Sequence, residues 1–378
     1  MGPVYLDHNA TSPLRPVARR ALLAALDEVG NPSSVHAFGR RARRRLEEAR
    51  ETLAARLGVD AERIVFTAGG TEANHLVLAQ ATGPVLVSAV EHPSVLENAP
   101  DAGRIPVDHG GRVDLAALER RLAGGGVALV SVMWANNETG VIQPVAEIAA
   151  LCRRHGVRFH TDAAQAVGRL PLDLGALGAD WVTLSAHKFG GPVGIGALVA
   201  GPEAEVRPVL RGGGQERGRR AGTENVPAAA GFAAALAAVE AEEWRRMAAL
   251  RDRFEAALGA AVPEAVVIAA DVPRLPNTSA VALPGVPAEL LVIRLDLEGV
   301  MVSAGSACSS GRVRRSHVLE AMGLPPDLAG STVRVSLGPA TSEEELARAV
   351  DAFARVARDP LVRRALRTTW EEEPSRAP

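Results

Sequence analysis

The feature that most constrains the fold is a series of short, unbroken apolar runs that alternate with helical patterns. The runs expected to be strands are Arg63–Phe66, Pro84–Ser88, Val127–Met133, Val157–Thr161, Trp181–Leu184 and Ile195–Ala200. A strand that is buried on both faces of a parallel sheet shows a continuous apolar run instead of an alternation. Helical patterns such as Ala37–Leu57 and Val145–His155 lie between these runs. The order predicts an α/β domain with a mostly parallel central sheet flanked by helices, and ligands at the carboxyl ends of its strands.

The pattern changes after about Gly231, where a long Ala/Glu/Arg-rich helix is expected to run toward Ala261. It is followed by two strand-like and two amphipathic helical segments, namely Ser279–Leu283, Val333–Leu337, Ala288–Glu298 and Glu343–Arg358. This change predicts a smaller α+β domain at the C-terminal end. We therefore expect three parts: residues 1–15, an N-terminal segment that includes the strand 4–6 and packs on the small domain; residues 16–250, the large domain; and residues 251–378, the small domain.

Charge and cysteine content exclude several classes of function. Lys and Arg number 42 against 44 Asp and Glu, giving a net charge of −2, so electrostatic binding of nucleic acid is not expected. Two cysteines cannot build a disulfide framework, and the histidines show no metal-ligand spacing, so no metal is predicted. The sequence shows neither an export signal nor roughly 20 uninterrupted apolar residues. We expect a cytosolic protein that does not contact the membrane.

Two chemically active residues follow neighbouring strand candidates. Lys188 comes shortly after the run Trp181–Leu184, and Asp162 directly follows Val157–Thr161. Alone, Lys188 would be read as a solvated surface lysine. Together, a lysine and an aspartate at one sheet edge are what pyridoxal phosphate requires, because the lysine forms a Schiff base and the carboxylate pairs with the protonated pyridine nitrogen.

Two further segments suggest chemistry, although each has a plainer interpretation. Gly69-Gly70-Thr71 precedes a helix expected over Glu72–Gln80, where free N–H groups could bind a phosphate; an ordinary strand–helix turn has the same pattern. Cys308 lies among small residues and glycines that predict a mobile, exposed loop, and the arginines that follow would favour a thiolate. An inert, half-buried cysteine is the alternative. Cys152 lies in a helical pattern and is expected to be structural.

Taken together, these motifs resemble the group I cysteine desulfurases of the IscS/NifS type, within the class V aminotransferases. The resemblance runs from Tyr5-Leu6-Asp7 through Arg334-Val335-Ser336-Leu337-Gly338. The matching segments between these ends are Asn31-Pro32-Ser33-Ser34, Gly70-Thr71-Glu72, Glu91-His92, Asn136-Asn137-Glu138-Thr139-Gly140, Asp162-Ala163-Ala164-Gln165, Ser185-Ala186-His187-Lys188, Arg220-Ala221-Gly222-Thr223 and Gly305-Ser306-Ala307-Cys308. The resemblance implies the pyridoxal phosphate-dependent transferase fold of type I.

Roles around the cofactor ring follow from the resemblance. Lys188 would attach the cofactor and carry the proton at the substrate Cα, and Asp162 would pair with the pyridine nitrogen. Asn137 and Gln165 would hold the phenolic oxygen, with Asn137 also near the substrate. His92 would stack on the ring and help with proton transfer; alone, it would be read as a helix-start or packing residue.

The resemblance also implies which residues bind the phosphate of the cofactor. Gly70, Thr71, Ser185 and His187 would contact it, and Thr223 would reach it from the partner subunit of a homodimer. Gly70 stands where alanine is common in the family.

The implied reaction removes sulfur from L-cysteine and leaves L-alanine. Arg334 would bind the substrate carboxylate, although a surface salt bridge is its plainer interpretation. Cys308 would take the sulfur as a persulfide and pass it to an acceptor protein, for iron–sulfur cluster assembly or tRNA thiolation. The basic stretch after Cys308 leaves the identity of the acceptor protein open. The sequence also does not separate this chain from family members that use the loop cysteine to ligate an iron–sulfur cluster.

Two other interpretations of the whole chain remain. One is a different pyridoxal phosphate enzyme of the same fold, either an aminotransferase or a C–S lyase. The other is a non-catalytic docking scaffold. The separation of 26 residues between Cys308 and Arg334 (334 − 308) fits the desulfurase group with the longer loop better than the group with the shorter one.

Overall fold

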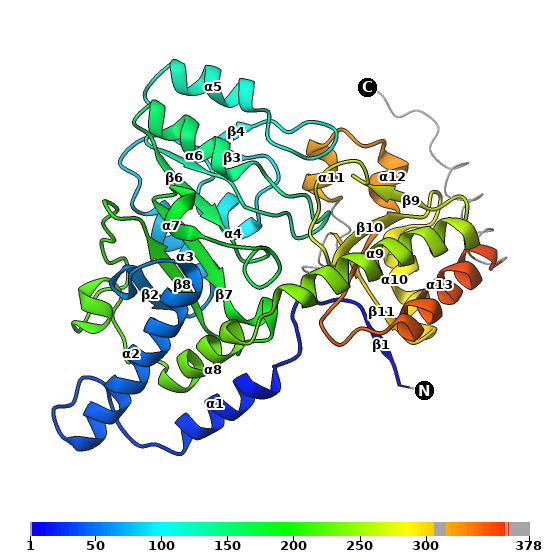
Figure 1. The fold of residues 1–378 in the computed structure, drawn as a ribbon. Helices are drawn as coiled ribbons and strands as arrows, with labels where there is room; N and C mark the ends of the chain where they lie inside the picture. Colours follow the sequence, from blue (N-terminus) through cyan, green and yellow to red (C-terminus); the bar gives the residue numbers. More distant parts are fainter. Residues whose placement is uncertain (1, 306–314, 360–361, 363–378) are drawn as a thin grey trace.

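A computed structural model describes residues 2–305, 315–359 and 362, and it places two sheets side by side (Figure 1). In the described residues the larger sheet has seven strands in the order β2-β8-β7-β6-β5-β3-β4. Their bounds are β2 Ile64–Thr67, β3 Val85–Ser88, β4 Gly103–Ile105, β5 Leu129–Ser131, β6 Arg158–Asp162, β7 Trp181–Ser185 and β8 Gly196–Ala200. The neighbours from β4 to β7 are parallel, whereas β8 is antiparallel to both β7 and β2.

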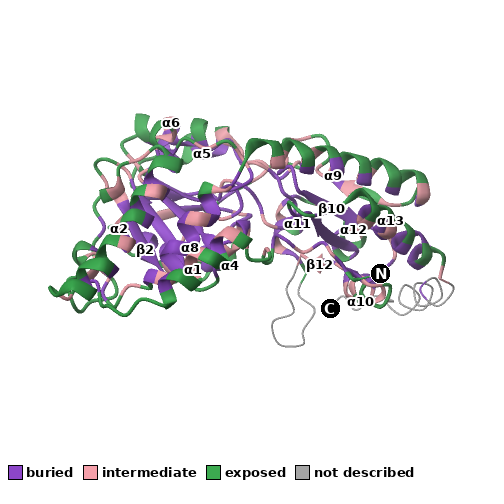
Figure 2. Cartoon of the chain, turned by 60° about the horizontal axis from the view of Figure 1, so that its bottom comes forward, coloured by how far each residue is buried: buried purple, intermediate pink, exposed green. Residues whose placement is uncertain are grey.

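Helices cover both faces of this sheet, which is why its strands are apolar without alternation. Their bounds are α1 Pro16–Leu26, α2 Ala37–Leu57, α3 Gly70–Leu78, α4 Pro93–Leu96, α5 Leu115–Ala123, α6 Val145–Arg154, α7 Leu174–Leu177 and α8 Val226–Ala237. Short 3-10 turns lie at Ala61–Arg63, Ala186–Phe189 and Gln215–Gly218. The alanine-rich α8 packs closely on α1 and α2, and its Phe232 contacts the rings of Phe66 and Phe189. Figure 2 shows the strands buried and the outward helix surfaces exposed.

The smaller sheet has the order β12-β13-β10-β9 and is antiparallel throughout. Its strands are β9 Val266–Ile268, β10 Thr278–Ala282, β12 Ser303–Ala304 and β13 Thr332–Ser336, and the helices of this region are α9 Ala241–Ala261, α10 Ala288–Leu297, α11 His317–Ala321, α12 Pro326–Gly330 and α13 Glu343–Arg358. The buried rings of Phe254 on α9 and Phe353 on α13 meet edge to face, 6.2 Å apart, in this second core.

The N-terminal segment forms a separate two-stranded sheet and is linked to the four-stranded sheet by a bridge. Strand β1 (Val4–Tyr5) pairs in parallel with β11 (Val300–Met301). Two residues later, Asp7 forms a parallel bridge to Ser336 at the end of β13. The chain then crosses to α1 under the larger sheet, so residues 6–15 connect the two sheets (Figure 1).

The structure confirms the α/β class and the mostly parallel, helix-flanked sheet, with several differences in detail. The edge strand β4 was not predicted, because three residues carry too short an apolar run. The single long helix expected after Gly231 is two helices, α8 and α9, separated at residues 238–240. Helix α3 begins at Gly70, two residues before the predicted start. Gly70 and Thr71 therefore lie in its first turn and not in the preceding loop. No helix in the described ranges is long and apolar enough to cross a membrane.

Candidate active site

A cavity of about 790 Å³ lies between the two sheets, at the carboxyl ends of the strands of the larger sheet. The start of α3, the end of β6 and the turn after β7 line one side of it, and Asn9 and Ala10 line another. Ser303–Gly305 and Arg334 contribute from the smaller sheet. The position agrees with the rule that ligands of parallel sheets bind beyond the carboxyl ends of the strands.

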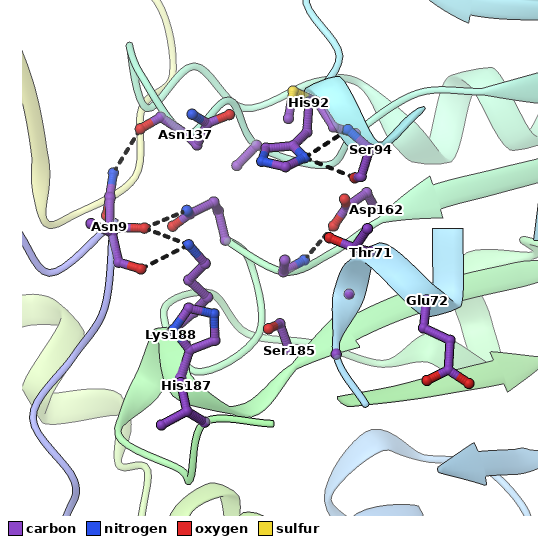
Figure 3. Close-up of a pocket in the computed structure, with 18 of the residues that line it drawn as sticks. Asn9, Thr71, Glu72, His92, Ser94, Asn137, Asp162, Ser185, His187 and Lys188 are labelled. Atoms are coloured by element: carbon purple, nitrogen blue, oxygen red, sulfur yellow. Dashed lines mark hydrogen bonds between the residues drawn. The ribbon is translucent and has the colours of Figure 1, made fainter. Parts of the chain in front are cut away.

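Lys188 points into this cavity from the 3-10 turn that follows β7 (Figure 3). Its Nζ donates to the backbone carbonyls of Asn9, at 2.8 Å, and Ala10, at 3.0 Å. Burial, and then the positive charges of Arg169 and Arg334, lowers the pKa of Lys188 to about 8. Near neutral pH a larger minority of the amine is therefore uncharged than in an ordinary lysine, which favours nucleophilic attack.

Arg169 supplies part of this positive field from below the pocket. Its side chain is buried, and its Nη2 donates to the carbonyls of Lys188, at 2.7 Å, and His8, at 3.1 Å, while Nη1 donates to the Gln165 side chain. Burial, and then the charge of Arg334, lowers the pKa of Arg169 to about 9, which leaves it a cation at neutral pH. Arg169 therefore fixes the backbone of Lys188 and makes its amine easier to deprotonate.

Asp162 is the last residue of β6, and its carboxylate also lines the cavity. Oδ1 accepts from the backbone N–H of Ala164, at 2.9 Å, and Oδ2 accepts from Asn74 Nδ2, at 2.7 Å. Two residues earlier on the strand, His160 is fully buried between Ser131 and Thr183, at 2.8 and 3.0 Å. Burial lowers the pKa of His160 to about 4, so it is a neutral core residue next to the site.

The first turn of α3 forms another wall of the cavity. Gly70 and Thr71 are the first residues of this nine-residue helix, so their N–H groups have no carbonyl within the helix to bond. A Cβ added to Gly70 would lie 3.5 Å from Cβ of Ser185 at the end of β7. His187 lines the same region, and burial lowers its pKa to about 4. The structure thus brings Gly70, Thr71, Ser185 and His187 together around one anion-compatible corner.

Asn137 and Gln165 line the cavity on either side of the N-terminal segment. Asn9 links them, because its Nδ2 donates to the carbonyl of Asn137, at 3.2 Å, and its own carbonyl accepts from Gln165 Nε2, at 3.0 Å. Asn9 is buried, and its Oδ1 accepts from Asn277 Nδ2, at 3.1 Å. Asn9 therefore fixes the side chain of Gln165 relative to the backbone of Asn137.

Arg334 reaches the cavity from β13 and is buried, which excludes the surface salt bridge considered from the sequence. Nη2 contacts Asp7 at 2.6 Å, and Nη1 donates to the carbonyl of Asn137 at 2.8 Å. Nε is buried and has no hydrogen-bond partner in the described part of the chain. The guanidinium is therefore held in place with donor capacity left over.

His92 borders the cavity at the start of α4, opposite Lys188 (Figure 3). Its Nδ1 accepts from the backbone N–H of Ser94, at 3.1 Å, and lies 2.7 Å from Ser94 Oγ. Burial, and then the charges of Lys188 and His317, lowers the pKa of His92 against the opposing effect of Asp162.

Three other residues singled out from the sequence are not among those that line the cavity in the described part of the chain. Thr223 is exposed and does not line the cavity of its own chain. Cys308 lies outside the described residues. Cys152 is buried in α6, where burial raises the pKa of its thiol to about 12, as expected for a structural cysteine.

Sequence reasoning missed several residues that shape the site: Asn9, Asn74, Ser94 and Arg169. Asn9 belongs to a segment close to a family pattern, but its partners are hundreds of residues away. Asn74 lies four residues after Gly70, so its helical spacing from the phosphate corner was the available signal. Arg169 carried no such signal.

Comparisons with known proteins agree with this geometry. The sequence profile of the aminotransferase class-V family matches residues 4–349. The chain belongs to the aminotransferase class-V family. A cysteine desulfurase from Cereibacter sphaeroides is 43% identical over 369 residues, which are 93% of this chain and 95% of that protein.

Solved structures of this class superpose closely. A NifS-like protein from Rickettsia africae has a TM-score of 0.88 and 35% identity, over 94% of this chain and 99% of that one. SspA in complex with cysteine has a TM-score of 0.78 and 29% identity, over 89% of this chain and 99% of that one. The class V assignment and the NifS-like fold confirm the resemblance inferred from the sequence.

Proposed function

We propose that the protein is a pyridoxal phosphate-dependent cysteine desulfurase that converts L-cysteine to L-alanine and transfers the sulfur to Cys308. The observation that carries the proposal is the convergence of the Lys188 amine, the Asp162 carboxylate and the first turn of α3 on one cavity. The names of the relatives support the same activity, and the cysteine bound to SspA supports L-cysteine as the substrate.

The residues present fit pyridoxal phosphate. An amine whose pKa is lowered to about 8 suits covalent attachment, and a carboxylate at the neighbouring strand end suits a pyridinium nitrogen. The free N–H groups of Gly70 and Thr71, with Ser185 and His187, suit its phosphate. Asn137 and Gln165 offer neutral amides for its phenolic oxygen. When bound, the group supplies an electron sink for charge that develops at the substrate carbon.

Lys188 performs the proton transfers in this proposal. Its Nζ would be the group that takes the proton from the substrate Cα. The carbonyls of Asn9 and Ala10 hold the amine at a defined position. The lowered pKa leaves more of the amine unprotonated at neutral pH than in an ordinary lysine, so more of it is able to act as a base.

Arg334 binds the substrate carboxylate. Its guanidinium is fixed by Asp7 and Asn137, so little side-chain entropy is lost when a carboxylate arrives. Its buried, unpartnered Nε and the remaining Nη hydrogens are the donors available for that contact.

The sulfur transfer balances without an added oxidant. The Cβ–S bond of L-cysteine breaks as an S–S bond to Cys308 forms. The electron pair of the broken bond remains with the carbon, which gains a proton to become the methyl group of alanine. Cys308 ends as a persulfide, which an acceptor protein, such as an iron–sulfur scaffold or a tRNA-thiolation enzyme, takes up. The expected setting is the cytosol.

A homodimer completes the proposal, with Thr223 of one subunit reaching the phosphate of the other. Its exposed side chain, away from the cavity of its own chain, is compatible with that role.

The experiment is anaerobic incubation of the purified holoenzyme with L-cysteine and a reductant, with alanine and sulfide as products. Wild type should form both; Lys188→Ala should lose the cofactor absorption that L-cysteine perturbs, together with turnover. Cys308→Ser should keep the spectral change and lose alanine formation. Full turnover by Cys308→Ser would instead indicate an aminotransferase or a C–S lyase. A chain that shows no cofactor absorption would be a docking scaffold.

A further inference from the structure

A continuous row of side chains joins Asp162 to His92 beneath the cavity. Asn74 on α3 is fully buried, and its Nδ2 lies 2.7 Å from Asp162 Oδ2 and 2.9 Å from Ser94 Oγ. Ser94 Oγ in turn lies 2.7 Å from His92 Nδ1. The row therefore connects the carboxylate and the imidazole that face the proposed cofactor from different elements.

The direction of each hydrogen bond in this row can be worked out. The backbone N–H of Ser94 can only donate, and it is aimed at His92 Nδ1, so Nδ1 carries no proton. An ionised carboxylate can only accept, so the NH₂ end of Asn74 must face Asp162.

The remaining hydrogens then have one arrangement. Asn74 Nδ2 has a second hydrogen, and it donates this to Ser94 Oγ. The hydroxyl hydrogen of Ser94 is consequently free to point at the lone pair of His92 Nδ1. One hydrogen of Asn74 Nδ2 thus points at Asp162 and the other at Ser94 Oγ, and His92 Nδ1 receives two hydrogens, from the backbone N–H and the hydroxyl of Ser94.

We propose that Asn74 and Ser94 are positioning residues that hold His92 as the neutral tautomer with its proton on Nε2. A neutral imidazole whose Nδ1 carries no proton must carry its hydrogen on Nε2. Protonation of Nδ1 would remove both hydrogen bonds that Ser94 donates to this nitrogen. His92 then serves the reaction as a ring and a hydrogen-bond donor. That use rests on the proposed function, and it leaves proton transfer at the substrate carbon to Lys188.

This assignment differs from the sequence expectation, in which His92 also takes part in proton transfer. The charged groups that face His92 are Asp162, Lys188 and His317. Lys188 and His317 oppose an imidazolium, as burial does, and Asp162 favours it. His317 contacts the backbone next to His92, because its Nε2 lies 2.9 Å from the carbonyl oxygen of Glu91. Asn74 already uses Oδ2 of Asp162, and this carboxylate has no direct contact with the imidazole among the described residues.

The first test reads the tautomer directly. Long-range ¹H–¹⁵N spectra of the histidine-labelled holoenzyme, with His92→Asn to assign the resonances, report which ring nitrogen carries hydrogen. At neutral pH we expect Nδ1 to resonate as an unprotonated nitrogen and Nε2 as a protonated one. A protonated Nδ1 would overturn the proposal. Because this readout needs no turnover, an inactive protein with the expected tautomer would refute the proposed function alone.

The second test perturbs the row. Ser94→Ala removes one of the two donors to Nδ1, so the pH at which this nitrogen becomes protonated should shift upward. Ser94→Thr keeps the hydroxyl and should restore the wild-type titration. Asn74→Leu releases the Ser94 hydroxyl from its partner and should also shift the titration upward. Titrations of Ser94→Ala and Asn74→Leu that match wild type would show that neither residue sets the state of His92.

Discussion

The buried ion pair between Arg50 on α2 and Glu216 offers a sharp test of how the larger sheet is held together. The side chains are 3% and 1% exposed. Arg50 Nη1 and Nη2 contact the two carboxylate oxygens at 2.8 and 2.9 Å, and the backbone N–H of Phe66 on β2 donates to the same carboxylate at 2.9 Å. Glu216→Gln keeps the shape and one oxygen acceptor. It leaves the buried guanidinium with Glu47 as its remaining ion-pair partner, whose carboxylate lies 3.2 Å from Arg50 Nε and is 35% exposed.

The expected cost follows from the burial. Removing one partner of a buried pair costs about 3–5 kcal/mol, because the remaining charge has lost both its water and its buried partner. The partly exposed Glu47 still compensates part of the Arg50 charge, so the cost should lie toward the lower end of this range. At about 2 °C per kcal/mol for a large chain, the thermal midpoint should fall by roughly 5–10 °C. The matched control is Glu28→Gln, because Glu28 pairs with Arg45 at the surface, where the side chains are 37% and 29% exposed. Such a pair contributes about 0–1 kcal/mol.

The assay is thermal unfolding of the three purified holoenzymes, followed by circular dichroism in the same buffer. The Glu216→Gln midpoint should lie well below that of Glu28→Gln, which should stay near wild type. If the two substitutions lowered the midpoint equally, the buried pair would contribute no more than a solvated one, and the reasoning would be wrong.

Three other predictions concern single residues near the site or the core. Burial raises the pKa of Glu91 to about 8 from an ordinary 4.5, so between these pH values the native state holds a proton that the unfolded chain has released. The thermal midpoint of wild type should therefore fall relative to that of Glu91→Gln as the pH rises. Parallel curves of midpoint against pH would contradict this prediction. Gly168→Ala should lower both the thermal stability, measured by calorimetry, and the cofactor content, measured by absorbance. The reason is that Gly168 has a φ of +79° and the new Cβ would lie 2.5 Å from Cβ of Phe189, the residue next to Lys188. Wild-type stability and cofactor content in this variant would refute the clash. In Cys308→Ser, iodoacetamide should alkylate Cys152 only after denaturation, because burial raises the pKa of that thiol to about 12. Mass spectrometry is the readout, and alkylation of Cys152 in the native protein would contradict the prediction.

The fold was largely predictable because burial on both sheet faces leaves a direct trace in the sequence. The apolar runs that become β2, β3 and β5–β8 were found within a few residues. The orientation of β8 was not predictable, because an apolar run has no direction. The break between α8 and α9 was missed, since alanine and glutamate favour helix on both sides of it.

The site was predictable where function depends on position along a strand. Lys188 and Asp162 follow strand ends, and the sheet brings them to one cavity. Asn74 and Arg169 were not predictable, because their roles come from contacts that only the folded chain creates. Asn74 lies 88 residues from Asp162, and nothing in the local sequence links the two.

The path of the N-terminal segment has a consequence for synthesis. Residues 4–10 leave the ribosome before the segments they pair with: β1 pairs with β11, and the backbone N–H of Asn9 donates to Ser336 Oγ, 327 residues further along. Until those late partners exist, Asn9 and Ala10 have no fixed place from which to receive the Lys188 amine. Translation products that stop before β13 therefore carry an unfinished pocket, and the Lys188 amine is held in place only in chains that extend through that strand.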